Sequence, residues 1–95
     1  MRVRWTRPAL QNLDDIQDFI ATESPLAAYR LVHDLSQLVI TGLGSAPLMG
    51  RPGRAPNTRE MVFPDLPYIV VYRVGEAVEI LAVMHTARRW PKAFD

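Results

Sequence analysis

The sequence contains no cysteine, which excludes disulfide bonds, thiolate nucleophiles and cysteine-ligated zinc. It has only two histidines, His33 and His85, so we expect neither a metal site built from side chains nor a bound cofactor. No apolar run approaches the roughly 18 residues of a membrane-spanning helix, and the N-terminus lacks the apolar core of a signal peptide. These absences predict a cytoplasmic protein that works without metal, cofactor or membrane.

Lysine is also scarce, because ten of the eleven basic residues are arginine. The formal net charge of +1 does not by itself indicate nucleic-acid binding. The charges are nevertheless polarised, since acidic residues crowd residues 14–23 and arginines crowd residues 51–59 and 88–89. Arginine suits bidentate contacts with phosphate or carboxylate groups. We interpret Asp14, Asp15 and Asp18 as a solvated helix face rather than a metal cluster.

The 95 residues, 48% of them hydrophobic, are enough for one folded domain with a single core, which we assign to residues 1–95.

Residues 3–5 alternate like a short strand. Apolar residues at helical spacing predict an amphipathic helix up to about residue 23, with Leu10, Leu13, Ile16, Phe19 and Ile20 on its apolar stripe. A second helix begins at Ser24-Pro25, an N-cap followed by proline, and we expect Gly42 and Gly44 to stop it. The short connection predicts an antiparallel helical hairpin.

Residues 44–57 are rich in glycine, proline and arginine, and we expect a surface loop without regular structure. Three strands follow, at residues 59–63, 68–74 and 78–84. The expected fold class is α+β, in the order β-α-α-β-β-β, with the helical hairpin on one face of a mainly antiparallel twisted sheet. Only residues 90–95 remain to cover the other face, so we expect that apolar face to bind a partner protein. The alternatives are dimerisation of the chain or a modest exposed patch.

Three motifs follow in order: T-R-E-x-V at residues 58–62, Y-I-V-V-Y-R-V at 68–74, and I-L-x-V-x-H-x-A-R-x-W-P at 80–91. With the strand, helical hairpin and Gly-Arg loop before them, they resemble the RelE/ParE superfamily of bacterial toxins. The resemblance covers nearly the whole chain. It implies the toxin of a type II toxin–antitoxin system, associated with growth inhibition and plasmid stabilisation. It also implies a cognate antitoxin that binds the toxin directly and makes any contact with DNA.

The superfamily has two branches with different targets. ParE-like members inhibit DNA gyrase, whereas RelE-like members cut mRNA on the ribosome. Nuclease members carry an arginine three residues before the strand tyrosine; here that position is Ile69, and no lysine precedes Lys92. These departures favour the ParE branch. A ribosome-dependent, metal-independent endoribonuclease remains the alternative, and a non-toxic relative that keeps antitoxin binding is a third possibility.

Each polar residue near the end of the predicted sheet has a functional and a structural interpretation. If the chain is a nuclease, the catalytic group would be His85, Arg59 and Arg88 or Arg89, supplying acid–base chemistry and positive charge. His85 could instead bind backbone and close the sheet end, and Arg59 could pair with Glu79 or with an acidic residue of the first helix.

The remaining basic residues are candidates for partner binding. Arg51 and Arg54 lie in the glycine- and proline-rich loop, and Arg89 and Trp90 follow the last strand. An arginine beside an aromatic ring can hold a partner by charge and stacking. The same residues could equally be a solvated loop and a C-terminal anchor. We expect His33 to lie on the surface.

Overall fold

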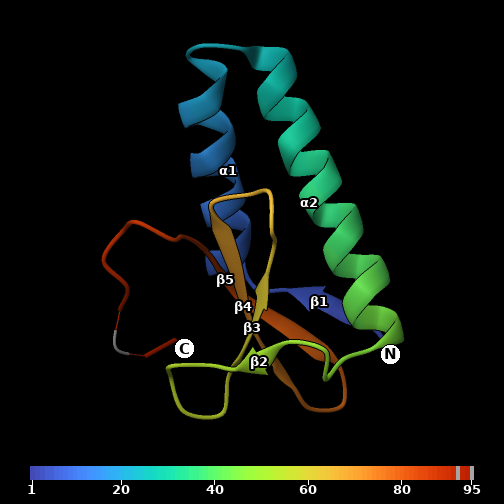
Figure 1. Cartoon of the computed structure of the whole chain (residues 1–95). Helices are drawn as coiled ribbons and strands as arrows, with labels where there is room; N and C mark the ends of the chain where they lie inside the picture. The colour runs from blue at the N-terminus through green and yellow to red at the C-terminus, as the bar shows by residue number, and fades with distance from the viewer. Residues whose placement is uncertain (92, 95) are drawn as a thin grey trace.

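The computed structural model describes residues 1–91, 93 and 94. It contains two helices and a five-stranded sheet in which the strands lie in the order β1-β5-β4-β3-β2. β1 pairs in parallel with β5, and the other neighbours are antiparallel. The predicted α+β order is confirmed, with one short strand added before β3. The elements are β1 (Val3–Trp5), α1 (Arg7–Ala21), α2 (Pro25–Ser45), β2 (Arg51–Pro52), β3 (Arg59–Val62), β4 (Tyr68–Val74) and β5 (Val78–His85) (Figure 1).

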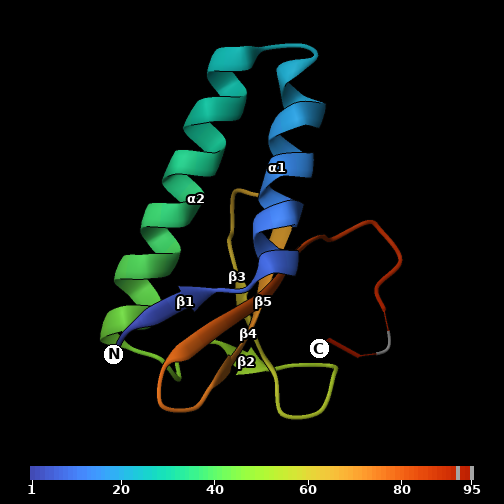
Figure 2. The same cartoon turned by 180° about the vertical axis from the view of Figure 1, so that it is seen from behind.

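The two helices form the predicted antiparallel hairpin and stand over one face of the sheet (Figures 1 and 2). Ser24 caps α2, because its hydroxyl accepts a hydrogen bond from the Ala27 amide at 3.2 Å. The predicted stop at the glycines was wrong, since α2 continues to Ser45. A Cβ atom on Gly42 would lie 3.2 Å from the Met61 methyl group, and one on Gly44 would lie 3.4 Å from the Met1 carbonyl. Gly42 therefore allows close packing against Met61, the contact at Gly44 is an ordinary one, and neither glycine has the positive φ of a helix C-cap.

The apolar stripe of α1 is only partly buried. Leu13 is in the core and Ile16 packs against it, but Leu10 and Phe19 are 49% and 67% exposed. Ala9, which was not part of the predicted stripe, is fully buried. The buried face of α1 is therefore narrower than the spacing of its apolar residues predicted, and Phe19 remains largely exposed.

The segment between α2 and β3 was predicted to have no regular structure, and this was wrong at two residues. Arg51 and Pro52 pair with β3, in register with Glu60 and Arg59. The chain then turns back, and the Gly53 amide donates to the Thr58 carbonyl at 2.8 Å. We call residues 46–58 the β2 loop.

The core has two parts, one on each face of the sheet. The larger part fills the space between the helices and the sheet and includes Leu35, Val39 and Tyr72. The smaller part, on the opposite face, consists of Val71, Leu81 and Ala82, with Met84, Trp90 and Phe94 packed against it. Leu81 is the extra residue of a β-bulge, because Val71 pairs with Ala82 while Tyr72 pairs with Ile80.

The second face of the sheet was expected to be uncovered, but part of it is covered by the chain itself. Residues 86–91, 93 and 94, which we call the C-terminal segment, bring two aromatic rings onto it. Lys92 and Asp95 lie outside the described residues. Neither helix is long and apolar enough to cross a membrane, within the part of the chain that the structure describes.

Candidate functional site

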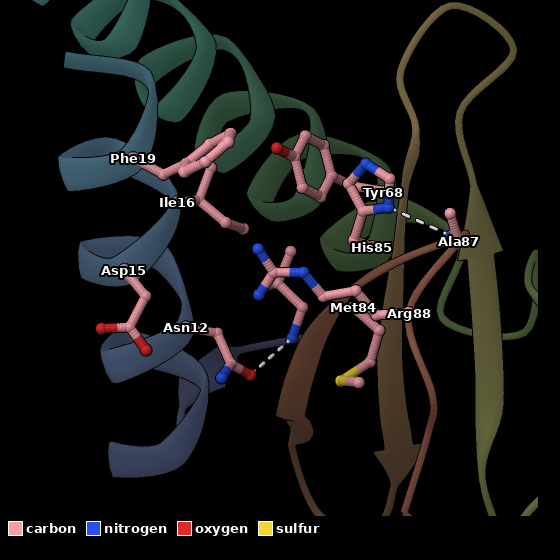
Figure 3. A pocket seen from close by; sticks show the side chains of 10 residues that line it. Asn12, Asp15, Ile16, Phe19, Tyr68, Met84, His85, Ala87 and Arg88 are labelled. Carbon is pink, nitrogen blue, oxygen red and sulfur yellow. Dashed lines mark hydrogen bonds between the residues drawn. The ribbon is translucent and has the colours of Figure 1, made fainter. Parts of the chain in front are cut away.

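A cavity of about 360 Å³ opens between α1 and the adjacent ends of β4 and β5. Asn12, Asp15, Ile16 and Phe19 line its α1 side (Figure 3). Tyr68, Val83, Met84, His85, Ala87 and Arg88 complete the wall. Asn12 also joins the two sides, because its side-chain oxygen accepts a hydrogen bond from the Val83 amide at 3.0 Å. The cavity thus combines an apolar interior with a carboxylate on one wall and a guanidinium on the other.

His85 is the last residue of β5 and is half-buried. It pairs with Tyr68 across the sheet, and the two rings meet edge to face with centroids 5.3 Å apart. Its Nδ1 atom accepts a hydrogen bond from the Ala87 amide at 3.0 Å. A neutral imidazole has one acceptor nitrogen, so the proton of the neutral ring lies on Nε2. The lone pair that a general base would use is already engaged by backbone.

Arg88 extends its side chain from the end of β5 toward α1 (Figure 3). Its backbone amide donates to the His85 carbonyl at 3.2 Å, so the turn after β5 fixes the position of the Arg88 backbone. Asp15 on the facing helix accepts a hydrogen bond from the Gln11 side chain at 2.9 Å. The structure therefore brings two of the three predicted nuclease residues, His85 and Arg88, to one cavity.

Arg59 lies elsewhere. It pairs with Tyr72, whereas His85 pairs with Tyr68, and four residues along a strand span about 13 Å. Its guanidinium donates to the Gly50 carbonyl at 2.8 Å and to the Leu48 carbonyl at 3.3 Å. The ion pairs expected for Arg59 are absent from the described residues.

Glu79, which we had considered as a partner of Arg59, binds other arginines. Arg73 donates to it at 2.8 Å, and Arg4 of β1 also contacts it. All three residues lie at the opposite end of β5 from His85. A sequence pattern could not select this pairing, because the parallel register of β1 on β5 is what places Arg4 opposite Glu79.

Glu60 is the centre of a charged cluster that the sequence did not reveal. Its side chain is 3% exposed. Arg51 donates to Oε1 through Nε at 3.1 Å and Nη2 at 2.9 Å, and Arg54 donates to Oε2 through its amide at 2.9 Å and Nε at 3.3 Å. Burial alone raises the pKa of Glu60, but the hydrogen bonds from Arg54 and Arg51 and the charges of both arginines lower it below its ordinary value of 4.5.

The two loop arginines expected to bind a partner thus already hold a carboxylate of their own chain. About half of each side chain is nevertheless exposed. Nothing in the sequence identified Arg51 and Arg54 as partners of Glu60, which lies between Arg59 and Met61.

Arg89 and Trp90 behave differently from one another. Arg89 is exposed, while Trp90 is half-buried against the second face of the sheet. The Trp90 indole N–H donates to the His85 carbonyl at 3.3 Å. The Arg54 guanidinium carbon lies 3.6 Å from the centre of the Trp90 ring, which is a cation–π contact.

The other polar residues, His33 and the three aspartates of α1, lie on the surface. His33 is exposed and stacks on Tyr29 with ring centroids 5.9 Å apart. Asp14, Asp15 and Asp18 are exposed. Across residues 1–91, 93 and 94, no group of three or more potential ligands is arranged to hold a metal ion.

Comparisons with known proteins match nearly the whole chain. Residues 3–90 match the family described as the ParE toxin of type II toxin-antitoxin system, parDE. The putative toxin Y4kP of Sinorhizobium fredii is 46% identical over 96% of this chain and 94% of its own length. The toxin RelE2 of Caulobacter vibrioides is 36% identical, over 92% of this chain and 97% of its own length.

A solved structure shares the fold. The chromosomal ParDE toxin–antitoxin system from P. aeruginosa contains a chain that superposes with a TM-score of 0.80 at 29% identity, covering 90% of this chain and 95% of that one. The similarity therefore includes the helical hairpin and the sheet that together enclose the cavity.

Proposed function

The chain belongs to the ParE toxin family of type II toxin–antitoxin systems, and from this premise we propose that it arrests growth by inhibiting DNA gyrase. In this proposal it acts in the cytoplasm. A cognate antitoxin neutralises it by direct binding and makes any contact with DNA. The ParDE pairing named for the family and for the similar structure supports an antitoxin partner.

The state of His85 is the observation that favours gyrase over RNA. Cleavage of RNA through its 2′-hydroxyl needs a general base with a free lone pair and cations around the reacting phosphate. The acceptor nitrogen of His85 is occupied by the Ala87 amide, and Arg59 is bound to loop carbonyls. Ile69, at the position where nucleases carry arginine, is 5% exposed. A gyrase inhibitor requires none of these groups to do chemistry.

An mRNA endonuclease is the second candidate, because one specific observation favours it. His85, Arg88 and the Tyr68 ring line a single cavity, and that cavity offers an ionisable ring, a fixed positive charge and an aromatic surface. In this case Arg88 would bind the phosphate, and His85 would have to release the Ala87 amide before it could accept a proton.

For the antitoxin, we propose that the exposed guanidinium groups recognise acidic side chains. Arg89 is exposed on the C-terminal segment, and the accessible halves of Arg51 and Arg54 lie on the β2 loop. The Trp90 ring, which the Arg54 guanidinium contacts, would add an aromatic surface for the antitoxin. Charged groups of this kind mainly set association rate and specificity.

The test measures the target directly. The chain is induced alone in a bacterial host, and incorporation of labelled thymidine and methionine is followed over the first minutes. Gyrase inhibition predicts an early fall in thymidine incorporation while translation continues, and purified gyrase should then lose supercoiling activity when the toxin is added. An early collapse of methionine incorporation, with cut mRNA detected by primer extension, would refute gyrase as the target and support the nuclease.

A further inference from the structure

Arg54 contacts two parts of the chain that are distant in sequence. Its amide and Nε atom bind the Glu60 carboxylate on β3, and its guanidinium lies over the ring of Trp90 in the C-terminal segment. Figure 1 shows the C-terminal segment leaving β5 and returning toward the β2 loop. This one side chain therefore joins the loop before β3 to the segment after β5.

Glu60 orients Arg54 for this contact. The carboxylate is buried and fixed in β3, opposite Val71 of the small core. Hydrogen bonds to Oε2 use the backbone amide and the Nε edge of Arg54, which leaves the flat face of the guanidinium for the indole. A planar guanidinium can bind a carboxylate with its edge and an aromatic ring with its face at the same time, and lysine cannot.

Trp90 in turn connects to the cavity. Its indole N–H donates to the carbonyl of His85, and the same carbonyl accepts from the Arg88 amide. The ring is half-buried against the small core of Val71, Leu81 and Ala82 and meets Phe94 edge to face. The position of Trp90 is thus linked, through one carbonyl oxygen, to both polar residues at the end of β5.

We propose that Arg54 is a positioning residue that holds the C-terminal segment against the second face of the sheet, and thereby fixes His85 and Arg88 at the cavity. The buried Glu60 carboxylate supplies the fixed point, and the Trp90 ring is the part that is held. A continuous series of contacts, from Glu60 through Arg54 and Trp90 to His85, then joins the β2 loop to the cavity. This connection lies within the chain and does not depend on which target the toxin has.

Arg51 provides a matched control. It binds the same carboxylate with two hydrogen bonds, and its side chain is 54% exposed against 51% for Arg54. Within the described part of the chain, the cation–π contact with Trp90 is made by Arg54 and not by Arg51. Arg51→Ala removes two side-chain hydrogen bonds to Glu60, whereas Arg54→Ala removes one and keeps the bond from its backbone amide. Arg51→Ala should therefore weaken the Glu60 cluster at least as much as Arg54→Ala, and only Arg54→Ala removes the contact with the indole.

The experiment measures hydrogen exchange of the full chain at neutral pH, resolved into a peptide that covers residues 86–95 and one that covers residues 51–60. Cation–π contacts have energies that correspond to a roughly 2- to 30-fold change in an opening equilibrium. Arg54→Ala should raise exchange in residues 86–95 by that factor relative to Arg51→Ala, although exchange in residues 51–60 should be no higher in Arg54→Ala than in Arg51→Ala. Equal exchange in residues 86–95 for both variants would overturn the proposal.

A second measurement follows the cavity itself. The His85 ring signals and the Trp90 indole N–H signal, identified with Trp90→Phe, are recorded by NMR for each variant. Arg54→Ala should shift both sets of signals and Arg51→Ala neither. Arg54→Lys keeps the charge opposite Glu60 and guards against failure to fold; it should shift the Trp90 signal while the β2 loop stays protected. Unchanged His85 signals in a folded Arg54 variant would refute the link to the cavity.

Discussion

The hydroxyl of Tyr72 accepts a hydrogen bond from the Gly50 amide at 2.9 Å and donates one to the Pro47 carbonyl at 2.8 Å. Tyr72 is fully buried in the centre of β4. Arg59 adds a hydrogen bond to the Gly50 carbonyl. The start of the β2 loop is therefore attached to the core by side chains of two neighbouring strands, although it has little regular structure of its own.

We expect Tyr72→Phe to destabilise the protein by about 1–3 kcal/mol, because it leaves the Gly50 amide and the Pro47 carbonyl without their partner. Tyr68→Phe is the matched control. Tyr68 is a second buried tyrosine of β4, and its hydroxyl has no hydrogen-bond partner within residues 1–91, 93 and 94. Urea denaturation of the three proteins tests this, and equal stability of the two variants would contradict the attachment.

Gly50→Ala should be strongly destabilising for a steric reason. A Cβ atom there would lie 2.5 Å from the Tyr72 hydroxyl oxygen and 2.9 Å from the Glu60 carbonyl oxygen, and neither buried group has room to move. We expect a loss of about 2 kcal/mol or more. Gly75→Ala should change stability by less than about 0.5 kcal/mol, since no atom lies within 4 Å of its Cβ position. Thermal unfolding of both variants decides the point.

Glu60→Gln should change how stability depends on pH. The folded-state pKa of Glu60 is lowered from 4.5, so its contribution is fully present above that value and is lost as the pH falls below it. We expect the wild-type free energy of unfolding to decrease from about pH 5 downward more steeply than that of Glu60→Gln. At neutral pH the variant should be less stable by about 1–3 kcal/mol, because charged hydrogen bonds to both arginines are weakened.

The control for this titration is Glu76→Gln, which removes a carboxylate from an exposed turn residue. Removing this exposed carboxylate should change the free energy of unfolding at neutral pH by less than about 0.5 kcal/mol. A Glu60→Gln curve of unfolding free energy against pH that runs parallel to that of the wild type would show that the arginine cluster does not contribute to acid stability.

His85→Ala separates the two candidate functions in cells. A nuclease that uses His85 as acid or base should lose about 10²–10⁴-fold of its activity, and with it its toxicity. A gyrase inhibitor should keep most of its toxicity if the protein folds, which circular dichroism and antitoxin binding can establish. We expect toxicity to persist. A folded, antitoxin-binding and non-toxic His85→Ala protein would argue for RNA cleavage.

Local sequence pattern was sufficient to predict the elements that depend mainly on residues close together in the sequence. The apolar run from Tyr68 to Val74 predicted β4 to the residue, and Ser24-Pro25 marked the start of α2. Helix starts and central strands depend on capping and on burial of consecutive side chains, and both are legible in a short window. The end of α2 lies one residue beyond Gly44, and neither Gly42 nor Gly44 forms the left-handed cap that glycines at a helix end predict. The packing of Gly42 depends on Met61, which is distant in sequence.

The candidate site was predictable only in part. His85 and Arg88 follow the same strand, so their proximity could be expected. Arg59 was assigned to the same group, but the register of β3 on β4 places it toward the other end of the sheet. The residues named as sites remain predictions until their variants are tested.

The sequence by itself determined the family, the α+β order and the absence of cysteine chemistry, because motif order, hydrophobic period and composition are properties of the chain read in one dimension. Only the tertiary structure decided that Glu60 is buried between Arg51 and Arg54, that Arg54 reaches Trp90, and that Trp90 and Phe94 cover the second face of the sheet. Each of these contacts joins residues whose spacing follows no local period. Strand register and the path of the C-terminal segment bring them together.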